Sequence, residues 1–139
     1  AKLKIHSLCQ VTLTLKNMFG CVPTRFHRLI IHPYIRRALI DVLQAAYPNF
    51  GLVDGIIGNQ VDEVASFQMP HGLIFGGHNC LAVDFVGCRL MGLNPENIEF
   101  LQLAKSFYGF DNAKIKADMD INKLKKNYDN RRNFEIMKR

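Results

Sequence analysis

The most regular pattern of apolar and polar positions begins just after Pro33. From residue 35 to residue 46, apolar side chains recur at every third or fourth position, and polar or charged side chains fill the positions between them. Pro33 can occupy a first helical position, and Pro48 ends the pattern. This stretch is predicted to be an amphipathic helix. Its apolar face consists of Ile35, Ala38, Leu39, Val42, Leu43 and Ala46.

Three shorter stretches have the pattern of strands. Residues 2–6 alternate between polar and apolar positions, which is typical of a strand with one buried face. Residues 50–57 form an apolar run bounded by Asn49 and Gly58, and residues 71–77 repeat this plan and end in two glycines. Each of the three is therefore predicted to be a strand.

The second half of the chain contains two further helical patterns. One helix is predicted at about residues 80–91 with Asn79 as its N-cap, and another opens at Pro95 and reaches about residue 107. A last edge strand is predicted over residues 113–118, with its two lysines on the solvent side.

The stretch from Thr12 to Gly20 reads T-L-T-L-K-N-M-F-G and leaves helix and strand open as alternatives. Its threonines favour a strand, whereas the spacing of Leu15, Met18 and Phe19 favours a helix. Residues 21–33 are predicted to be a long, charged connection, a kind of segment that often carries function.

The order of these elements predicts an α/β domain over residues 1–118. Its expected architecture has three layers, with a largely parallel sheet flanked by helices. Residues 119–139 are predicted to form a basic, polar tail. Because the first strand begins at the second residue, we expect this domain to be the second part of a larger one.

Charge is distributed unevenly along the chain, whose net charge is +6. Residues 1–50 hold seven Lys or Arg against one Asp, residues 51–110 hold two against six acids, and residues 111–139 hold nine against five. Two basic regions therefore flank an acidic centre. This pattern favours an anionic partner, either a small anion or a nucleic acid.

The cysteines and the hydropathy suggest a cytoplasmic protein. The four cysteines, at positions 9, 21, 80 and 88, lack the two-residue spacing of zinc or iron–sulfur loops. We expect buried or idle thiols in a reducing compartment, and the alternative is a single metal site formed by all four. No apolar run approaches the roughly 20 residues that span a bilayer.

Candidate binding chemistry is concentrated in the basic first third. Lysine and arginine can neutralise an anion there, while histidine can hydrogen-bond it or transfer a proton near neutral pH. The residues with these properties, together with one amide, are Lys4, His6, Lys16, Asn17, Arg25 and His27.

Two carboxylates have both structural and functional interpretations. Asp54 interrupts the apolar run 50–57, where it either forms a turn before Gly55 or belongs to a site. Asp84 falls in the first turn of the predicted helix 80–91, where the helix dipole alone favours an anion. A binding role is the alternative for both.

The chain lacks the G-x-G-x-x-G, P-loop and nucleophile-elbow motifs, but it resembles the domain-of-unknown-function family 362. The matching motifs are K-x-H at Lys4 and His6, T-L-x-x-K-N-x-F-G at residues 12–20, His27, V-D-G-I at residues 53–56, A-V-D at residues 82–84 and R-L-x-G at residues 89–92. The resemblance implies a larger α/β domain, frequent association with iron–sulfur segments, and no settled reaction. The chain departs from the family pattern at two places, around residues 57–61 and 79–80, where the family tends to have a carboxylate and this chain does not.

The leading hypothesis is a redox-associated domain that binds a small anionic ligand. Its catalytic candidates are Lys16, His27 and His6, and its ligand-binding candidates are Lys4, Asn17, Arg25, Asp54 and Asp84. We expect Lys16 and Asn17 to face His6, His27 and Asp54 across one site.

No cofactor motif is present, so any iron–sulfur cluster would belong to a partner protein or to a segment outside this chain. An enzymatic role would then be that of one part of an iron–sulfur-linked oxidoreductase. The alternatives are a nucleic-acid or acidic-protein binding module and a non-catalytic subunit of an iron–sulfur complex.

Overall fold

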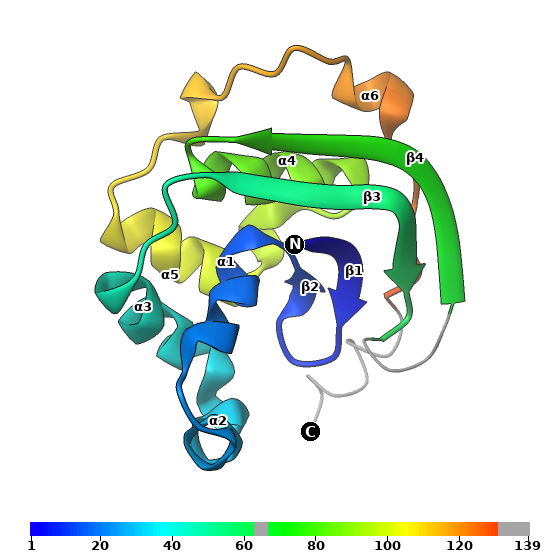
Figure 1. Cartoon of the computed structure of the whole chain (residues 1–139). Coiled ribbons are helices and arrows are strands. Elements are labelled where there is room, and N and C mark those ends of the chain that lie inside the picture. Colours follow the sequence, from blue (N-terminus) through cyan, green and yellow to red (C-terminus); the bar gives the residue numbers. More distant parts are fainter. Residues whose placement is uncertain (63–66, 131–139) are drawn as a thin grey trace.

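The fold is built on one mixed sheet of four strands. It is seen in a computed structural model that describes residues 1–62 and 67–130. The strands lie in the order β2-β1-β3-β4 (Figure 1). Their bounds are β1 (Lys2–His6), β2 (Gln10–Thr12), β3 (Gly51–Gln60) and β4 (Phe67–Gly77).

The α/β class is confirmed, but the expected largely parallel sheet is wrong. Only β1 and β3 run parallel, whereas β1 pairs with β2 and β3 pairs with β4 in antiparallel fashion. Six residues separate β3 from β4, and a parallel pair needs a crossover connection of about a dozen or more. The chain therefore returns as a hairpin.

Six α-helices accompany the sheet in the described part of the chain. The helical patterns after Pro33 and after Asn79 are confirmed, and Asn79 caps its helix by accepting a hydrogen bond from the Ala82 amide. The helices are α1 (Thr14–Asn17), α2 (Arg25–Ile31), α3 (Ile35–Ala45), α4 (Cys80–Leu90), α5 (Glu99–Phe107) and α6 (Ile121–Leu124).

Three local predictions change. The ambiguous stretch 12–20 holds the last residue of β2, then α1, then a 3₁₀ turn (Met18–Cys21). The expected connection 21–33 contains α2, which Thr24 caps by accepting a hydrogen bond from the His27 amide. The expected strand 113–118 is wrong, because a 3₁₀ turn (Asn112–Lys114) leads there into irregular backbone.

The core lies between the sheet and the central helix α4. Leu81, Phe85 and Leu90 of α4 are almost completely buried, and α4 packs against β4, α1 and α5. The helix α3 buries Ile35 and Leu39 on the apolar face that the sequence predicts. Hydrophobic burial on one side of the sheet thus fixes the positions of α1, α3, α4 and α5.

The opposite face of the β3–β4 hairpin is apolar and open in the described part of the chain. Leu52, Ile56 and Ile74 are 55%, 53% and 56% exposed on it. The third layer of the predicted architecture is therefore not seen over this hairpin.

A strap formed by residues 124–130 crosses the domain beside α4. The amides of Lys126 and Tyr128 donate to the carbonyls of Leu90 and Met91, at 2.8 and 3.0 Å. Tyr128 is 5% exposed, and its hydroxyl lies 3.2 Å from Nδ1 of His71. Within the predicted tail 119–139, this part packs on the domain, and residues 131–139 lie outside the described residues.

Candidate functional site

Asp84 is a fully buried carboxylate that holds the start of α1. Its Oδ1 accepts hydrogen bonds from the amide and hydroxyl of Thr14, at 2.8 and 2.5 Å, and its Oδ2 accepts one from the Leu15 amide at 3.0 Å. Burial raises the pKa of Asp84 to about 7, and the bonds from Thr14 and Leu15 oppose that rise. The observed role of Asp84 is therefore to fix α1, which carries Lys16 and Asn17.

Lys16 and Asn17 occupy the last turn of this short helix. Asn17 is exposed and Lys16 is half-buried. Asp84 anchors the start of α1 through the amides of Thr14 and Leu15, and α1 packs beside β2. The backbone of Lys16 and Asn17 is positioned by these contacts.

His6 and Lys4 lie on β1, on the face opposite the buried Leu3 and Ile5. Nδ1 of His6 accepts hydrogen bonds from the amides of Leu8 and Cys9, both at 3.2 Å, so the turn after β1 fixes the ring. The His6 side chain is 2% exposed. Lys4 pairs in register with Thr12.

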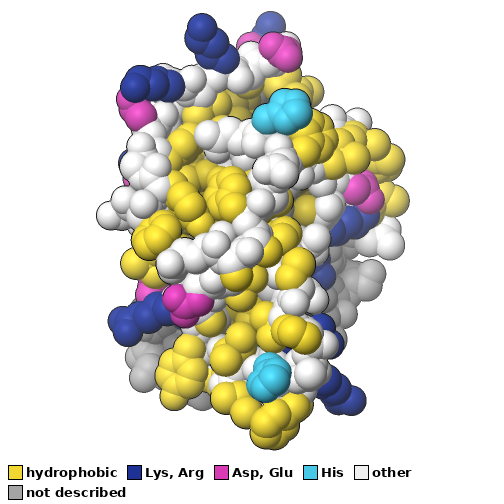
Figure 2. Space-filling model, turned by 60° about the vertical axis from the view of Figure 1, so that its left-hand side comes forward, with side chains coloured by type: hydrophobic (Ala, Val, Ile, Leu, Met, Phe, Trp, Pro, Cys, Tyr) yellow, Lys and Arg dark blue, Asp and Glu magenta, His cyan; other side chains and the backbone are white. Residues whose placement is uncertain are grey.

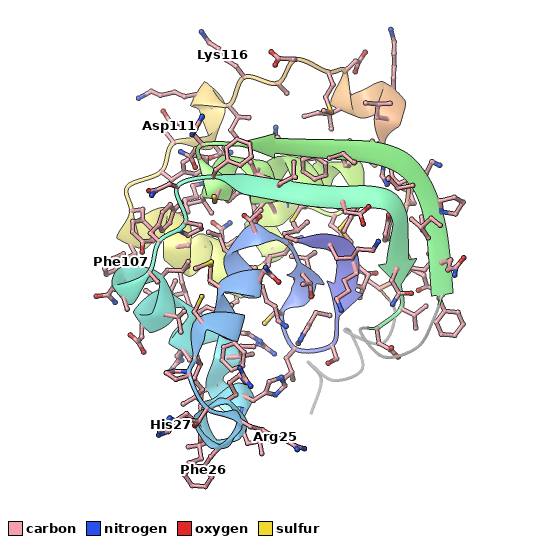
Figure 3. All side chains as sticks on the ribbon, viewed as in Figure 1. Arg25, Phe26, His27, Phe107, Asp111 and Lys116 are labelled. Atoms are coloured by element: carbon pink, nitrogen blue, oxygen red, sulfur yellow. The ribbon has the colours of Figure 1, made fainter. Side chains whose placement is uncertain are left out.

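The histidine ring beside His6 belongs to His32, with centroids 6.2 Å apart. His27 lies on α2, where it is exposed and its ring centroid is 6.1 Å from that of Phe26. Figure 3 shows Arg25 and His27 at the lower end of the molecule, on the projecting helix α2. Their side chains are surrounded by solvent.

Asp54 forms an ion pair with Lys2 across the β1–β3 pairing. Lys2 Nζ lies 2.8 Å from Asp54 Oδ2, and both side chains are almost half exposed. The hydrogen bond from Lys2, and then one from the Ile56 amide, lower the pKa of Asp54. Asp54 is thus an ionised surface carboxylate at neutral pH.

The eight predicted site residues come from β1, α1, α2, β3 and α4. Their contacts named above are local or pairwise, with Thr14 and Leu15, Lys2 and Ile56, His32, Thr24, Phe26 and the turn after β1. A single site uniting Lys16, Asn17, His6, His27 and Asp54 stays a prediction.

The largest cavity described lies elsewhere, between the end of α3, the start of α4 and the segment after α5. It encloses about 600 Å³, and none of the eight predicted residues lines it. We call it the Tyr47–Lys116 cavity. Its lining includes Tyr47, Asn79, Ala82, Tyr108, Lys114 and Lys116.

Tyrosine rings form one wall of this cavity. The rings of Tyr47 and Tyr108 lie 4.8 Å apart between centroids, with 59° between their planes. Burial raises the pKa of Tyr47 to about 12, although a hydrogen bond with the Leu81 backbone opposes the rise. The phenol of Tyr47 consequently remains a hydrogen-bond donor at neutral pH.

The facing wall is net positive. It contains Lys114, Lys116 and Asp111, and Lys114 lies 3.5 Å from Asp111 in an exposed ion pair. Lys116 is exposed, and Figure 3 shows its side chain at the upper end of the molecule, pointing outward. The ion pairs found among the described residues do not include Lys116. A smaller hollow of about 160 Å³ shares Ala82, Ile115 and Lys116 with this cavity and extends it toward apolar residues of β4 and α4.

Sequence reasoning missed this cavity because its walls are distant in sequence. The sequence pattern predicts Asn79 only as a helix cap and the lysines at 114 and 116 only as edge protection. One signal in the sequence is that a tyrosine directly follows each of two predicted helices, Tyr47 after the first and Tyr108 after the second.

The cysteines do not form a common metal site. Cys9, Cys80 and Cys88 are buried and Cys21 is exposed, and all four thiols are free. Burial raises the pKa of Cys80 and of Cys88. In residues 1–62 and 67–130, no group of three or more His, Cys, Asp or Glu could hold a metal ion.

Comparison with known proteins gives a distant relative and a family. The chain is 28% identical over 104 residues to a thylakoid-associated protein of Synechocystis sp., a match that covers 70% of this chain and 32% of the relative. The chain thus spans about a third of that relative's length. No solved structure matches it. In the part of the chain that the structure describes, no helix is long and apolar enough to cross a bilayer. The model of the family "Domain of unknown function (DUF362)" matches residues 1–89, and the chain belongs to this family.

Proposed function

We propose that this domain binds a small anionic ligand in the Tyr47–Lys116 cavity. The observation that carries the proposal is the combination of a cavity of about 600 Å³ with two lysines on one wall and two tyrosines on the other. This volume lies within the roughly 300–1,000 Å³ of small-molecule sites. Ligand sites of this kind combine apolar or aromatic walls with a few polar groups that fix orientation.

The walls favour a ligand that combines an anionic group with a flat ring. Lys116 would neutralise a phosphate or carboxylate, and the Tyr47 hydroxyl would donate a hydrogen bond to it. Tyr108, a residue that is 37% exposed, offers a ring face on which a planar ring could stack. The adjoining hollow beside Val83 and Val86 would take an apolar substituent.

The redox association rests on the family resemblance. The Lys/His/Asn constellation rests on the basic, histidine-containing residues of the first third of the chain together with that resemblance, and neither depends on the cavity. Under this proposal, Lys16, His6 and His27 remain the candidates for a reaction that would require a second site. Any iron–sulfur cluster would be held by a partner protein or by a segment outside this chain.

Binding titrations with matched variants test the proposal. The ligands would be inorganic phosphate, pyrophosphate, citrate, adenosine monophosphate and flavin mononucleotide, followed by calorimetry or thermal shift. Three double variants would be compared: K114Q/K116Q for the cavity, K16Q/H27Q for the constellation, and K123Q/K125Q as an exposed control on the same C-terminal segment.

The proposal expects at least one ligand to bind wild type and K123Q/K125Q equally. Loss of charge-assisted hydrogen bonds in K114Q/K116Q should weaken that binding roughly tenfold or more. If K16Q/H27Q weakened binding while K114Q/K116Q did not, the ligand site would be the predicted constellation instead.

A further inference from the structure

The helix α2 has an apolar stripe that faces solvent. Phe26, Leu29 and Ile30 are 68%, 64% and 53% exposed, and α2 has no buried residue. Their i, i+3, i+4 spacing places all three on one face of the helix. A surface helix normally turns such a face to the core, so the stripe is a candidate interaction surface.

The other side of α2 attaches it to the domain. Arg28 donates from its guanidinium to the carbonyl oxygens of Val22 and Gly20, at 3.1 and 3.5 Å. Ile31 packs partly buried against the core. The stripe therefore faces outward because Arg28 and Ile31 occupy the inward side.

Cationic or titratable residues border the stripe. Around a helix of 3.6 residues per turn, Arg25 falls on one side of it and His27 on the other, and both are exposed. The first acidic residue in the chain is Asp41, so residues 1–40 carry no negative side chain. The charge around the stripe is complementary to an anionic surface.

The shape of this region favours a flat partner. Figure 1 shows α2 projecting from the lower end of the molecule, and Figure 2 shows hydrophobic side chains gathered around a histidine at that end. Phe26 points away from the body of the domain (Figure 3). A projecting apolar tip can enter the boundary between lipid headgroups and acyl chains without a matching groove.

We propose that α2 is a membrane-contact element that docks on anionic lipid. Phe26, Leu29 and Ile30 insert at the headgroup boundary, and Arg25 contacts lipid phosphates beside them. A nucleic acid would use the cations but would leave the three apolar side chains without a role. This surface is separate from the Tyr47–Lys116 cavity, so either proposal can fail alone.

Tryptophan fluorescence gives a direct test, because the chain contains no tryptophan. Phe26→Trp introduces a single reporter at the tip of α2, and Leu52→Trp introduces one on the exposed face of β3 as a control. The probe is phosphatidylcholine vesicles that contain phosphatidylglycerol, compared with pure phosphatidylcholine. The tryptophan at 26 should shift to shorter wavelength and be quenched by brominated lipid, and the one at 52 should not.

Vesicle sedimentation with matched triple variants completes the test. F26S/L29S/I30S removes the stripe, and L52S/I56S/I74S removes three side chains of similar exposure from the sheet face. Loss of three apolar side chains that insert into the lipid should weaken binding to anionic vesicles roughly tenfold or more in the first variant only. Circular dichroism checks that both variants fold.

Three results would overturn the proposal. One is absence of binding of wild-type protein to anionic vesicles. Another is equal binding by wild type and F26S/L29S/I30S. The third is a change from dimer to monomer in that variant together with an unshifted tryptophan at 26, which would assign α2 to contact with a second copy of the chain.

Discussion

Asp84 and Thr14 form a buried link between α4 and α1 that spans 70 positions in the sequence. The hydroxyl of Thr14 lies 2.5 Å from Asp84 Oδ1 and 3.1 Å from the carbonyl oxygen of Cys80. The hydroxyl proton is therefore shared between two acceptors, and the carboxyl group also accepts from the amides of Thr14 and Leu15. These hydrogen bonds oppose the rise in the pKa of Asp84 to about 7 that burial causes.

The first prediction is a pH dependence of stability that originates at Asp84. Its pKa is about 7 in the folded protein against an ordinary value of 3.8, so the folded state binds more protons between these values. The free energy of unfolding should therefore fall as pH rises from about 4 to about 7. Urea unfolding across this range should show a smaller slope for Asp84→Asn.

Asp84→Asn should also cost about 1–3 kcal/mol at low pH, because its side-chain NH2 replaces an oxygen that accepts from the backbone amide of Thr14 or Leu15, and an NH2 group cannot accept that hydrogen bond. Asp118→Asn, which changes an exposed carboxylate, is the matched control. A D84N variant whose stability follows pH as the wild type does would show that other groups set the dependence.

The second prediction concerns the contact between Gly58 and the strap. A Cβ at Gly58 would collide with the Tyr128 hydroxyl and lie 2.8 Å from the carbonyl oxygen of Leu3. Gly58→Ala should therefore push the strap away from β3 and lower the free energy of unfolding by about 1–3 kcal/mol. Gly20→Ala, which meets no atom within 4 Å, should change it by less than about 0.5 kcal/mol. Equal stability of the two variants would contradict the packing described for Tyr128.

The third prediction is that acid loosens the strap through His71. Its Nε2 lies 2.8 Å from the carbonyl oxygen of Leu124, so this nitrogen carries the proton and Nδ1 accepts from Tyr128. Burial, and then the charge of Lys126, lower the pKa of His71 against the opposing hydrogen bond to Leu124. The associated stability is present above the ordinary histidine pKa and is lost as pH falls through the lower folded value.

Hydrogen exchange at the Lys126 and Tyr128 amides would measure this loosening. Exchange corrected for its intrinsic pH dependence should accelerate on acidification in wild type and in the exposed control His78→Gln. His71→Gln keeps a neutral donor toward Leu124 and should remove the acceleration. Unchanged acceleration in H71Q would assign the effect to another group.

Sequence patterns located the elements whose signals are local. The helix after Pro33 and the Asn79 cap were found because periodicity and capping depend on neighbouring residues. The pairing of β3 with β4 is not a local property, because the direction of β4 depends on β3. Helix α2 is not among the predicted elements, although Phe26, Leu29 and Ile30 have helical spacing. The capping contact from Thr24 to the His27 amide was a local signal for α2.

The candidate site was harder to predict for the same physical reason. The prediction that Asp84 lies in the first turn of its own helix is wrong, because the first turn of α4 contains no acidic residue. Its observed partner Thr14 lies in the stretch 12–20, for which the sequence leaves helix and strand open. The cavity brings Tyr47 beside Tyr108 and Lys116 only after α3, α4 and α5 have packed together. The residue spacing within a single segment therefore cannot predict the lining of this cavity.

The most direct measurement for the proposed function is native mass spectrometry of the protein purified from cells under mild, anaerobic conditions. We predict that wild-type protein carries a small anionic molecule, which fragmentation can identify. We predict that K114Q/K116Q loses it while K123Q/K125Q and K16Q/H27Q retain it. Retention of the same molecule by K114Q/K116Q, with its loss from K16Q/H27Q, would contradict the assignment of the ligand to the Tyr47–Lys116 cavity.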